Sequence, residues 1–278
     1  MKQLSLVIVN YRSSQSLQEC LTGLLDTIVD SGLEIFVVNN DSAQELASVS
    51  NSVNPPIHWI QNPSNLGFAV AANIGFRASS RDFVLILNPD VMVQAEALRT
   101  LLDTLALNPD AAIALPRLNN PDGSLQYSCR RFYNLRTLIL RRAPFNRIAP
   151  DHSAIREHLM LDWDHQTLTP VDWGLGAAML VRRSAISDAN LFDERFFLYF
   201  EDVDLCLRMW RQGWKVLYNP AAAFVHQHQR ESGQTWNFAA KRHHLVSLMK
   251  FLWKHHGRLR MEPKSERERS SVLPNRQN

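Results

Sequence analysis

The sequence lacks the features that mark small secreted domains and membrane proteins. Only three cysteines occur in 278 residues, Cys20, Cys129 and Cys206, and none of them forms a CxxC pair. An odd number of widely separated cysteines predicts neither a disulfide framework nor a zinc site, and it favours a reducing, cytoplasmic compartment. No apolar run approaches the roughly 20 residues of a membrane-spanning helix, and the first apolar run is too short for a signal peptide.

Two common nucleotide-binding signatures are also missing. The sequence contains neither GxGxxG nor GxxxxGKS/T, so it supports neither a Rossmann dinucleotide site nor a P-loop. Its composition, 45% hydrophobic and 21% charged, is that of a globular protein, which excludes disorder of the whole chain. A length of 278 residues suffices for one large α/β domain with a substantial core.

Positive charge is concentrated toward the end of the chain. The formal net charge is only +3, yet from Arg230 onward eleven Lys and Arg residues stand against four Glu. Such a segment favours contact with an anionic surface. Nucleic acid is one candidate surface, but no binding motif accompanies the arginine pairs at 130–131 and 141–142. We therefore expect no nucleic-acid partner.

The first hundred residues alternate between apolar runs and segments of helical spacing. Apolar runs typical of buried strands occur at residues 4–9, 35–38, 57–60 and 83–87, and helical spacing occurs at residues 14–28, 69–78 and 95–107. This order predicts an α/β fold with a Rossmann-like, mainly parallel sheet flanked by helices. Further along we expect a strand within residues 171–181, a helix at 201–211, a strand at 215–218 and a helix at 236–253.

Polar residues follow each of the four apolar runs. They are Asn10-Tyr11, residues 39–42, residues 62–65 and Asn88-Pro89-Asp90. Because the carboxyl ends of parallel strands meet at one edge of a sheet, and ligands bind outside that edge, these residues indicate a crevice. Asn88-Pro89-Asp90 taken alone has a second interpretation, since all three residue types favour turns.

Seven segments carry a resemblance to a known enzyme family. In chain order they are VIVNYRS, VVNNDS, NLGFAVAANIGF, LILNPDV, WGLGAAMLVRR, FFLYFEDVDLCLRMWRQGWKV and PAAAFVHQHQRES, and they span roughly residues 4–232. The sequence resembles the inverting nucleotide-sugar glycosyltransferases of family 2, and most closely their rhamnosyltransferase-like branch. The resemblance implies the GT-A fold with a smaller acceptor-side region.

With this resemblance the chain divides into four parts. They are a nucleotide-sugar-binding α/β half at residues 1–115, an acceptor-side and catalytic half of the same domain at 116–233, a C-terminal helix at 234–261, and a tail of disordered composition at 262–278.

The resemblance implies a metal site after the fourth strand. Asp90 stands where the family has a DxD motif, so it would ligate Mg²⁺ or Mn²⁺ together with the donor diphosphate, although Asn88 replaces the first aspartate. His226 lies where the family often supplies a metal-contacting histidine, and imidazole suits Mn²⁺ better than Mg²⁺. His228 keeps open the alternative of two surface histidines in a loop.

The acids at the start of the 201–211 helix have two interpretations. Acids in the first turn of a helix complement its dipole and need no catalytic role. In the ED motif of the family, however, the aspartate is the general base. It matches Asp202, with Glu201 as an orienting or acceptor-contacting neighbour.

The resemblance also implies contacts to the donor nucleotide. Tyr11 would pack against a pyrimidine ring whose edge is read near Asn10. Asn39 stands where the family usually has an aspartate that accepts the pyrimidine N3–H, and Asp41 is a nearby substitute. Further donor contacts are implied at Asn65, Gly67, Asn73 and Arg230.

The sugar and acceptor pocket is implied at Trp173, Gly174 and Gly176. A tryptophan there would offer a flat apolar face to a pyranose ring, and a buried structural role for Trp173 is the alternative.

We therefore expect an inverting glycosyltransferase that uses a pyrimidine-diphosphate sugar, dTDP-L-rhamnose first, and a glycan or lipid-linked glycan acceptor in bacterial surface polysaccharide synthesis. A UDP-sugar donor and a noncatalytic nucleotide-sugar-binding relative are the alternatives. We expect the protein in the cytoplasm. The 236–253 helix has three open arrangements: resting on the cytoplasmic face of the inner membrane, packing on its own domain, or forming a homodimer.

Overall fold

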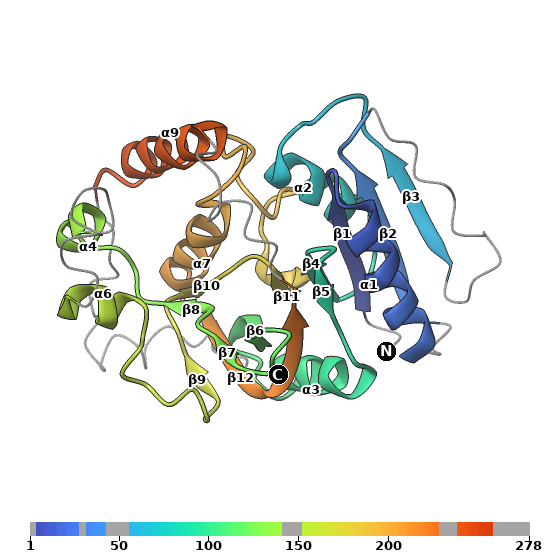
Figure 1. Cartoon of the computed structure of the whole chain (residues 1–278), viewed down its shortest axis with the longest axis horizontal. Helices are drawn as coiled ribbons and strands as arrows, with labels where there is room; N and C mark the ends of the chain where they lie inside the picture. The colour runs from blue at the N-terminus through green and yellow to red at the C-terminus, as the bar shows by residue number, and fades with distance from the viewer. Residues whose placement is uncertain (1–3, 28–31, 43–55, 141–151, 228–237, 258–278) are drawn as a thin grey trace, which may run out of the picture.

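The structure is a computed structural model that describes residues 4–27, 32–42, 56–140, 152–227 and 238–257. One large sheet runs through its centre, and helices cover both faces of the sheet (Figure 1). The strands lie in the order β3-β2-β1-β4-β11-β6-β12-β5, with β7 paired to β6 and β9 paired to β12. This is the α/β architecture predicted from the sequence.

The first part of the sheet is parallel, as predicted. Its strands are β1 (Leu4–Asn10), β2 (Glu34–Asn39), β3 (Ile57–Gln61) and β4 (Phe83–Leu87). The intervening helices are α1 (Ser14–Thr27) and α2 (Phe68–Ala78). β1 and β4 are buried along their whole length, which explains their continuous apolar sequence.

The second part of the sheet is mixed. β11 (Ala178–Arg182) runs antiparallel to β4 and to β6 (Ala111–Asn119). β12 (Lys215–His226) runs parallel to β6 and antiparallel to β5 (Val91–Met92) and β9 (Thr169–Pro170). β12 is longer than the predicted strand at 215–218 because it continues along β6 after an irregularity between Asn219 and Ala223. The proposed boundary between residues 115 and 116 falls inside β6.

The predicted strand within residues 171–181 is two separate strands. β10 (Trp173–Gly174) pairs with β8 (Cys129–Arg130) in a small second sheet, and β11 follows after a turn. The remaining elements are β7 (Leu125–Gln126), α3 (Ala95–Leu107), α4 (Leu135–Leu140), α6 (Ser153–His158), the short 3-10 helix η1 (Arg183–Ala185), α7 (Glu201–Arg211) and α9 (Phe238–Lys254). Residues 236 and 237 of the last predicted helix lie outside the described residues.

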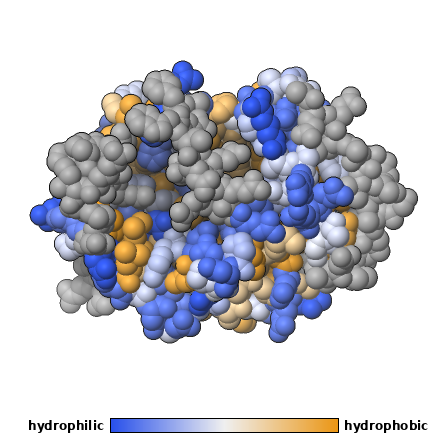
Figure 2. Space-filling view, viewed as in Figure 1, coloured by the Kyte–Doolittle hydropathy of each residue, from blue (hydrophilic) through white to orange (hydrophobic). Residues whose placement is uncertain are grey.

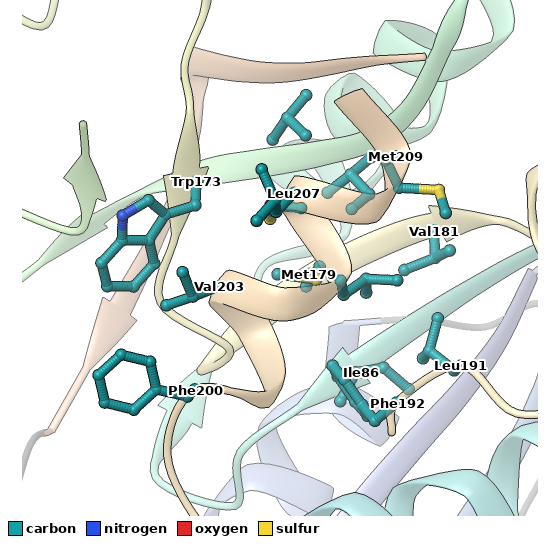
Figure 3. Close-up of a cluster of buried hydrophobic side chains, with 14 of the residues drawn as sticks. Ile86, Trp173, Met179, Val181, Leu191, Phe192, Phe200, Val203, Leu207 and Met209 are labelled. Atoms are coloured by element: carbon teal, nitrogen blue, oxygen red, sulfur yellow. The ribbon is translucent and has the colours of Figure 1, made fainter. Parts of the chain in front are cut away.

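Two hydrophobic cores lie on opposite faces of the sheet. α1 and α3 contribute to one core, and α2, α7 and α9 contribute to the other. Figure 3 shows Val203, Leu207 and Met209 of α7 among the side chains of the second core. Because full burial of one such side chain contributes about 1.5–3 kcal/mol, this contact fixes α7 firmly against the sheet.

The start of α7 is set by an unusual backbone. Tyr199 and Phe200, just before the helix, have φ values of 68° and 69°. Such left-handed residues cost of order 1–3 kcal/mol each and persist where the surrounding packing holds them. The ring of Phe200 is 3% exposed, so its burial holds this turn in place. Glu201 and Asp202 are thereby placed in the first turn of α7.

The surface is mostly hydrophilic on the face shown in Figure 2, and apolar side chains form separate patches there. Among the described residues, no helix combines the length and apolar character that crossing a bilayer requires.

Candidate active site

The polar residues after the parallel strands lie along one edge of the sheet. β3, β2, β1 and β4 are neighbours and run in the same direction, so their carboxyl ends meet at that edge. The predicted convergence of four polar strand ends is confirmed by this topology.

A network of amides joins the ends of β1, β2 and β3. Asn10 Nδ2 donates to Asn39 Oδ1 at 2.9 Å, and Asn39 Nδ2 donates to Gln61 Oε1 at 2.8 Å. Asn10 and Asn39 are 0% and 2% exposed. The oxygen of Asn39, expected to face a pyrimidine, therefore already accepts a hydrogen bond inside the protein. A buried, fully engaged amide network makes this end of the sheet rigid.

Asn40 is a second centre of this network, and the sequence interpretation missed it as a site residue. Asn40 Nδ2 donates to Asn65 Oδ1 at 2.9 Å, and Asn40 Oδ1 accepts from the backbone N–H of Leu66 at 3.0 Å. Asn65 Oδ1 also accepts from Gly67 N–H at 2.9 Å. Asn40 thus holds the loop that leads into α2. The sequence of residues 39–42 could not indicate this role, because all four residues are polar and any of them could have formed these contacts.

Gly67 is required by the protein itself. Its φ is 88°, and a Cβ there would lie 2.6 Å from the carbonyl oxygen of Phe197. The neighbouring Phe68 N–H donates to that same oxygen at 2.8 Å. The absence of a side chain at Gly67 therefore allows a close approach to residue 197, which joins the α2 loop to the segment before α7.

Tyr11 and Asp41 border this network. Tyr11 is 41% exposed, and the guanidinium of Arg12 lies 5.2 Å from the centre of its ring. Tyr11 thus presents an exposed ring directly after the end of β1. The Asp41 residue is 8% exposed, and its backbone carbonyl accepts from Asn39 Nδ2 at 3.1 Å.

Asn73 does not have the position expected of a nucleotide contact. Its side chain is 0% exposed, its Nδ2 donates to the Phe192 carbonyl at 2.8 Å, and its Oδ1 accepts from Phe192 N–H at 2.8 Å. The prediction for Asn73 is corrected on this basis: the side chain holds the 190–194 loop against α2.

Asp90 and His226 come together although they are far apart in sequence. β5 pairs with the end of β12, so Val91 lies opposite His226. Asp90 Oδ1 lies 3.3 Å from His226 Nε2, and the Asp90 carbonyl accepts from Gln227 N–H at 2.8 Å. The imidazole is almost fully buried, whereas the Asp90 side chain is 22% exposed and accessible from the edge.

Gln126 orients this histidine, and the sequence gave no signal for it. Its Oε1 lies 2.7 Å from His226 Nδ1, and its Nε2 donates to Asn120 Oδ1 at 3.3 Å. Because the amide oxygen can only accept, Nδ1 carries a proton in this contact. Nε2 is then the ring nitrogen that faces Asp90.

The Asp90 and His226 pair fits a divalent cation. A carboxylate oxygen and an imidazole nitrogen that lie 3.3 Å apart can share a proton or a cation. Two ligand atoms bound to one ion at about 2.1 Å and near right angles lie about 3 Å apart. No cluster of three or more His, Cys, Asp or Glu side chains suited to a metal occurs in the described part of the chain. A cation here would take its other ligands from phosphate and water.

Asp202 and Glu201 form the second acidic group. Asp202 Oδ2 accepts from Gly176 N–H at 3.1 Å and Oδ1 accepts from Val203 N–H at 2.8 Å. Burial raises the pKa of Asp202 to about 6, against the opposing effect of these two N–H donors. Glu201 is 6% exposed, and burial followed by the charge of Asp202 raises its pKa well above the usual value.

The two acidic groups are connected through two consecutive residues. Gly176 N–H donates to Asp202, and the Ala177 carbonyl accepts from Asn88 N–H at 2.8 Å. The turn between β10 and β11 therefore links the Asn88-Pro89-Asp90 segment to the first turn of α7. Gly176 also lies beside the Asp202 side chain, since a Cβ at this position would be 3.5 Å from Asp202 Cβ.

Trp173 and Gly174 face the interior. Trp173 is 4% exposed, its Nε1 donates to the Arg131 carbonyl at 3.0 Å, and its ring lies among buried side chains in Figure 3. A Cβ on Gly174 would lie 2.5 Å from Leu115 Cδ1. Trp173 therefore has the buried structural position that was the alternative to sugar stacking, and Gly174 packs closely against Leu115. The predictions for Arg230 and His228 concern residues outside the described part.

Residues 2–244 match the family described as "Glycosyltransferase like family 2". The chain belongs to glycosyltransferase family 2. Its relatives include the N-acetylglucosaminyl-diphospho-decaprenol L-rhamnosyltransferase of Mycobacterium tuberculosis, 28% identical over 91% of this chain and 85% of that protein. The rhamnosyltransferase WbbL of Escherichia coli K12 is 31% identical over 64% of each chain. These similarities confirm the rhamnosyltransferase-like branch.

The fold of this glycosyltransferase is the GT-A fold predicted above. The crystal structure of GalNAc-T7 with UDP, GalNAc and Mn²⁺ has a TM-score of 0.62, with 13% identity over 98% of this chain and 51% of that one. The crystal structure of Staphylococcus aureus TarS residues 1–349 has a TM-score of 0.54, with 13% identity over 96% of this chain and 77% of that one.

Proposed function

We propose that this glycosyltransferase is metal-dependent and inverting, and that it moves L-rhamnose from dTDP-L-rhamnose to a glycan or lipid-linked glycan acceptor of the bacterial surface. The observation that carries the proposal is the linked arrangement of two acidic groups. Asp90 faces an imidazole nitrogen, and Asp202 is a buried carboxylate with a raised pKa, on the other side of the Gly176–Ala177 turn.

The relatives support this donor and acceptor class. The mycobacterial protein is named for L-rhamnosyl transfer to an N-acetylglucosaminyl-diphospho-decaprenol, and the Escherichia coli protein is named a rhamnosyltransferase. The GalNAc-T7 structure contains UDP and Mn²⁺. A reaction in the cytoplasm is part of this proposal, and the three described cysteines, which are all free and buried, support a reducing compartment.

Asp90 and His226 would serve the leaving group. Departure of a nucleoside diphosphate leaves negative charge on the β-phosphate, and a divalent cation held by these two side chains would neutralise that charge. Gln126 holds the imidazole so that Nε2, rather than Nδ1, is presented to the ligand.

Asp202 would serve the nucleophile. Its carboxylate accepts the proton of the incoming acceptor hydroxyl, which attacks the anomeric carbon from the face opposite the diphosphate and inverts its configuration. Burial raises the pKa of both carboxyl groups, and at Glu201 the charge of Asp202 adds to this rise. The Gly176 N–H fixes one carboxylate oxygen of Asp202 and thereby its orientation.

A UDP-sugar is the second donor candidate, because uracil and thymine present the same hydrogen-bonding edge. The engaged oxygen of Asn39 favours neither base.

The first prediction concerns the pH dependence of the transfer. A base acts only when it is deprotonated, so kcat/KM should fall about tenfold per pH unit below about 6 and level off above that value. Asp202→Asn should lower kcat by about 10²–10⁴-fold and leave donor binding intact. Initial rates of transfer measured from about pH 5 to about pH 8 test both expectations. An Asp202→Asn variant that kept the activity of the parent protein would show that Asp202 is not the base.

The second prediction concerns Gln126. Gln126→Met removes the acceptor for His226 Nδ1 and should weaken Mn²⁺ binding in the presence of dTDP by about 10–100-fold. Gln126→Glu keeps an acceptor at that place and should retain most of the affinity. Titration of free Mn²⁺ by electron paramagnetic resonance measures both. Equal affinities for the two variants would show that Gln126 does not position the ligand.

The third prediction tests the function itself. UDP, dTDP and GDP should be compared, each with and without Mn²⁺, by thermal unfolding of the purified chain. We expect a rise in Tm only for a pyrimidine diphosphate with the metal, with dTDP giving the larger rise. Asp90→Asn should lose the rise, and Asp103→Asn, which removes an exposed carboxylate of α3, should keep it. Equal stabilisation with and without Mn²⁺ would contradict metal dependence.

A further inference from the structure

α9 has apolar side chains on two opposite faces. The inner face carries Leu248 and Phe251, which are 5% and 1% exposed and belong to the core shared with α7. The outer face carries Leu245, Val246, Met249 and Trp253, which are 48%, 44%, 59% and 74% exposed. The spacing of these four residues places them on one side of the helix. A helix that only packed on its own domain would need apolar residues on one face.

The inner face and its polar edge already hold α9 in place. Asp204 of α7 is 0% exposed. Its Oδ1 accepts from Lys254 Nζ at 2.7 Å and lies 2.8 Å from His255 Nε2. Ser247 Oγ donates to the Leu198 carbonyl at 2.7 Å. None of these contacts involves the outer face. Its four apolar side chains therefore lie on a helix that other contacts already hold against the domain.

The charged residues of α9 itself have one sign. α9 contains Lys241, Arg242, Lys250 and Lys254 and no acidic residue. At helical spacing, Arg242 falls within the apolar face, while Lys241 and Lys250 fall on its two sides. Apolar residues between lysines and arginines, ending in a tryptophan, are typical of helices that lie in the plane of a membrane interface.

We propose that the outer face of α9, defined by Leu245, Val246, Met249 and Trp253, docks this protein onto an anionic lipid surface. In this arrangement the helix lies flat, with the apolar side chains of its outer face among the acyl chains and the exposed Lys241 and Arg242 at the headgroups. Figure 1 shows α9 at the outer rim of the molecule, and apolar and hydrophilic side chains adjoin in that region of Figure 2.

Charge complementarity favours lipid over the two other occupants. A second copy docked through the same face would bring the basic residues of two α9 helices together, which is repulsive. Residues 258–278 of the same chain contain six Lys and Arg against three Glu, so they too are positively charged. An anionic bilayer attracts both α9 and this following segment.

The docking helix contacts the segment that leads into the proposed catalytic acids. The rings of Phe197 and His243 stack at 4.7 Å, and those of Phe200 and Phe251 lie 5.4 Å apart. A lipid-bound α9 would therefore hold the start of α7 close to the membrane, where a lipid-linked acceptor resides. The docking itself does not depend on the proposed function, because vesicle binding is measured without turnover.

Cosedimentation of the full chain with vesicles tests the proposal. We expect binding to an equal mixture of phosphatidylcholine and phosphatidylglycerol, weak binding to phosphatidylcholine alone, and loss of binding at high salt. The combined variant Leu245→Ser, Met249→Ser and Trp253→Ser should lower the partition coefficient at least about tenfold. The matched control is Leu107→Ser, which removes an 80% exposed leucine of α3 and should bind as the parent does.

A second variant keeps the test valid if the serine variant folds poorly. Lys241→Gln with Arg242→Gln changes two exposed side chains and should weaken binding about fivefold for each charge. Parental binding by both variants, or a parent that stays in the supernatant, would overturn the proposal. It would also be overturned if the serine variant changed the oligomeric mass, because that result would assign the face to a second copy. A serine variant with a clearly lower Tm but with the vesicle binding of the parent would show that the outer face packs against another part of the same chain.

Discussion

Two backbone hydrogen bonds made by consecutive residues connect the two acidic groups of this protein. Gly176 N–H donates to Asp202 Oδ2 at 3.1 Å, and the Ala177 carbonyl accepts from Asn88 N–H at 2.8 Å. The first turn of α7 and the segment after β4 are therefore tied to the same short turn. β12 then returns beside β5 and places His226 next to Asp90. The order of strands in the sheet makes these contacts possible.

Burial gives the two acidic groups different chemistry. Asp90 lies at the edge of the sheet, partly exposed and facing an imidazole nitrogen, where a cation shared with phosphate oxygens can reach it. Asp202 lies in a less polar environment, and burial brings its pKa to about 6, close to the pH at which a general base works well. Neither property belongs to aspartate as such, because each follows from the position that the fold gives to that carboxylate.

Much of the fold could be predicted from the sequence, and part of the site could not. α7 occupies the predicted residues because a long amphipathic segment follows a dense aromatic run, and the polar strand ends converge because parallel strands must end at one edge. Gln126 was missed because its partner, His226, is 100 residues away and meets it only through tertiary pairing. The sequence left two roles open for Trp173, because a buried and a ligand-facing tryptophan have the same local sequence, and the structure shows the buried one. β10 separates from β11 only through its pairing with β8.

The most direct test of the central claim is whether His226 and a bound cation are in contact. Electron spin echo envelope modulation of Mn²⁺ bound together with dTDP detects nitrogen nuclei coordinated to the metal. The expected result is coupling to an imidazole nitrogen that disappears in His226→Gln and persists in His58→Gln, which changes an exposed histidine of β3. A bound Mn²⁺ without nitrogen coupling, or with a coupling that survives His226→Gln, would contradict the site described here.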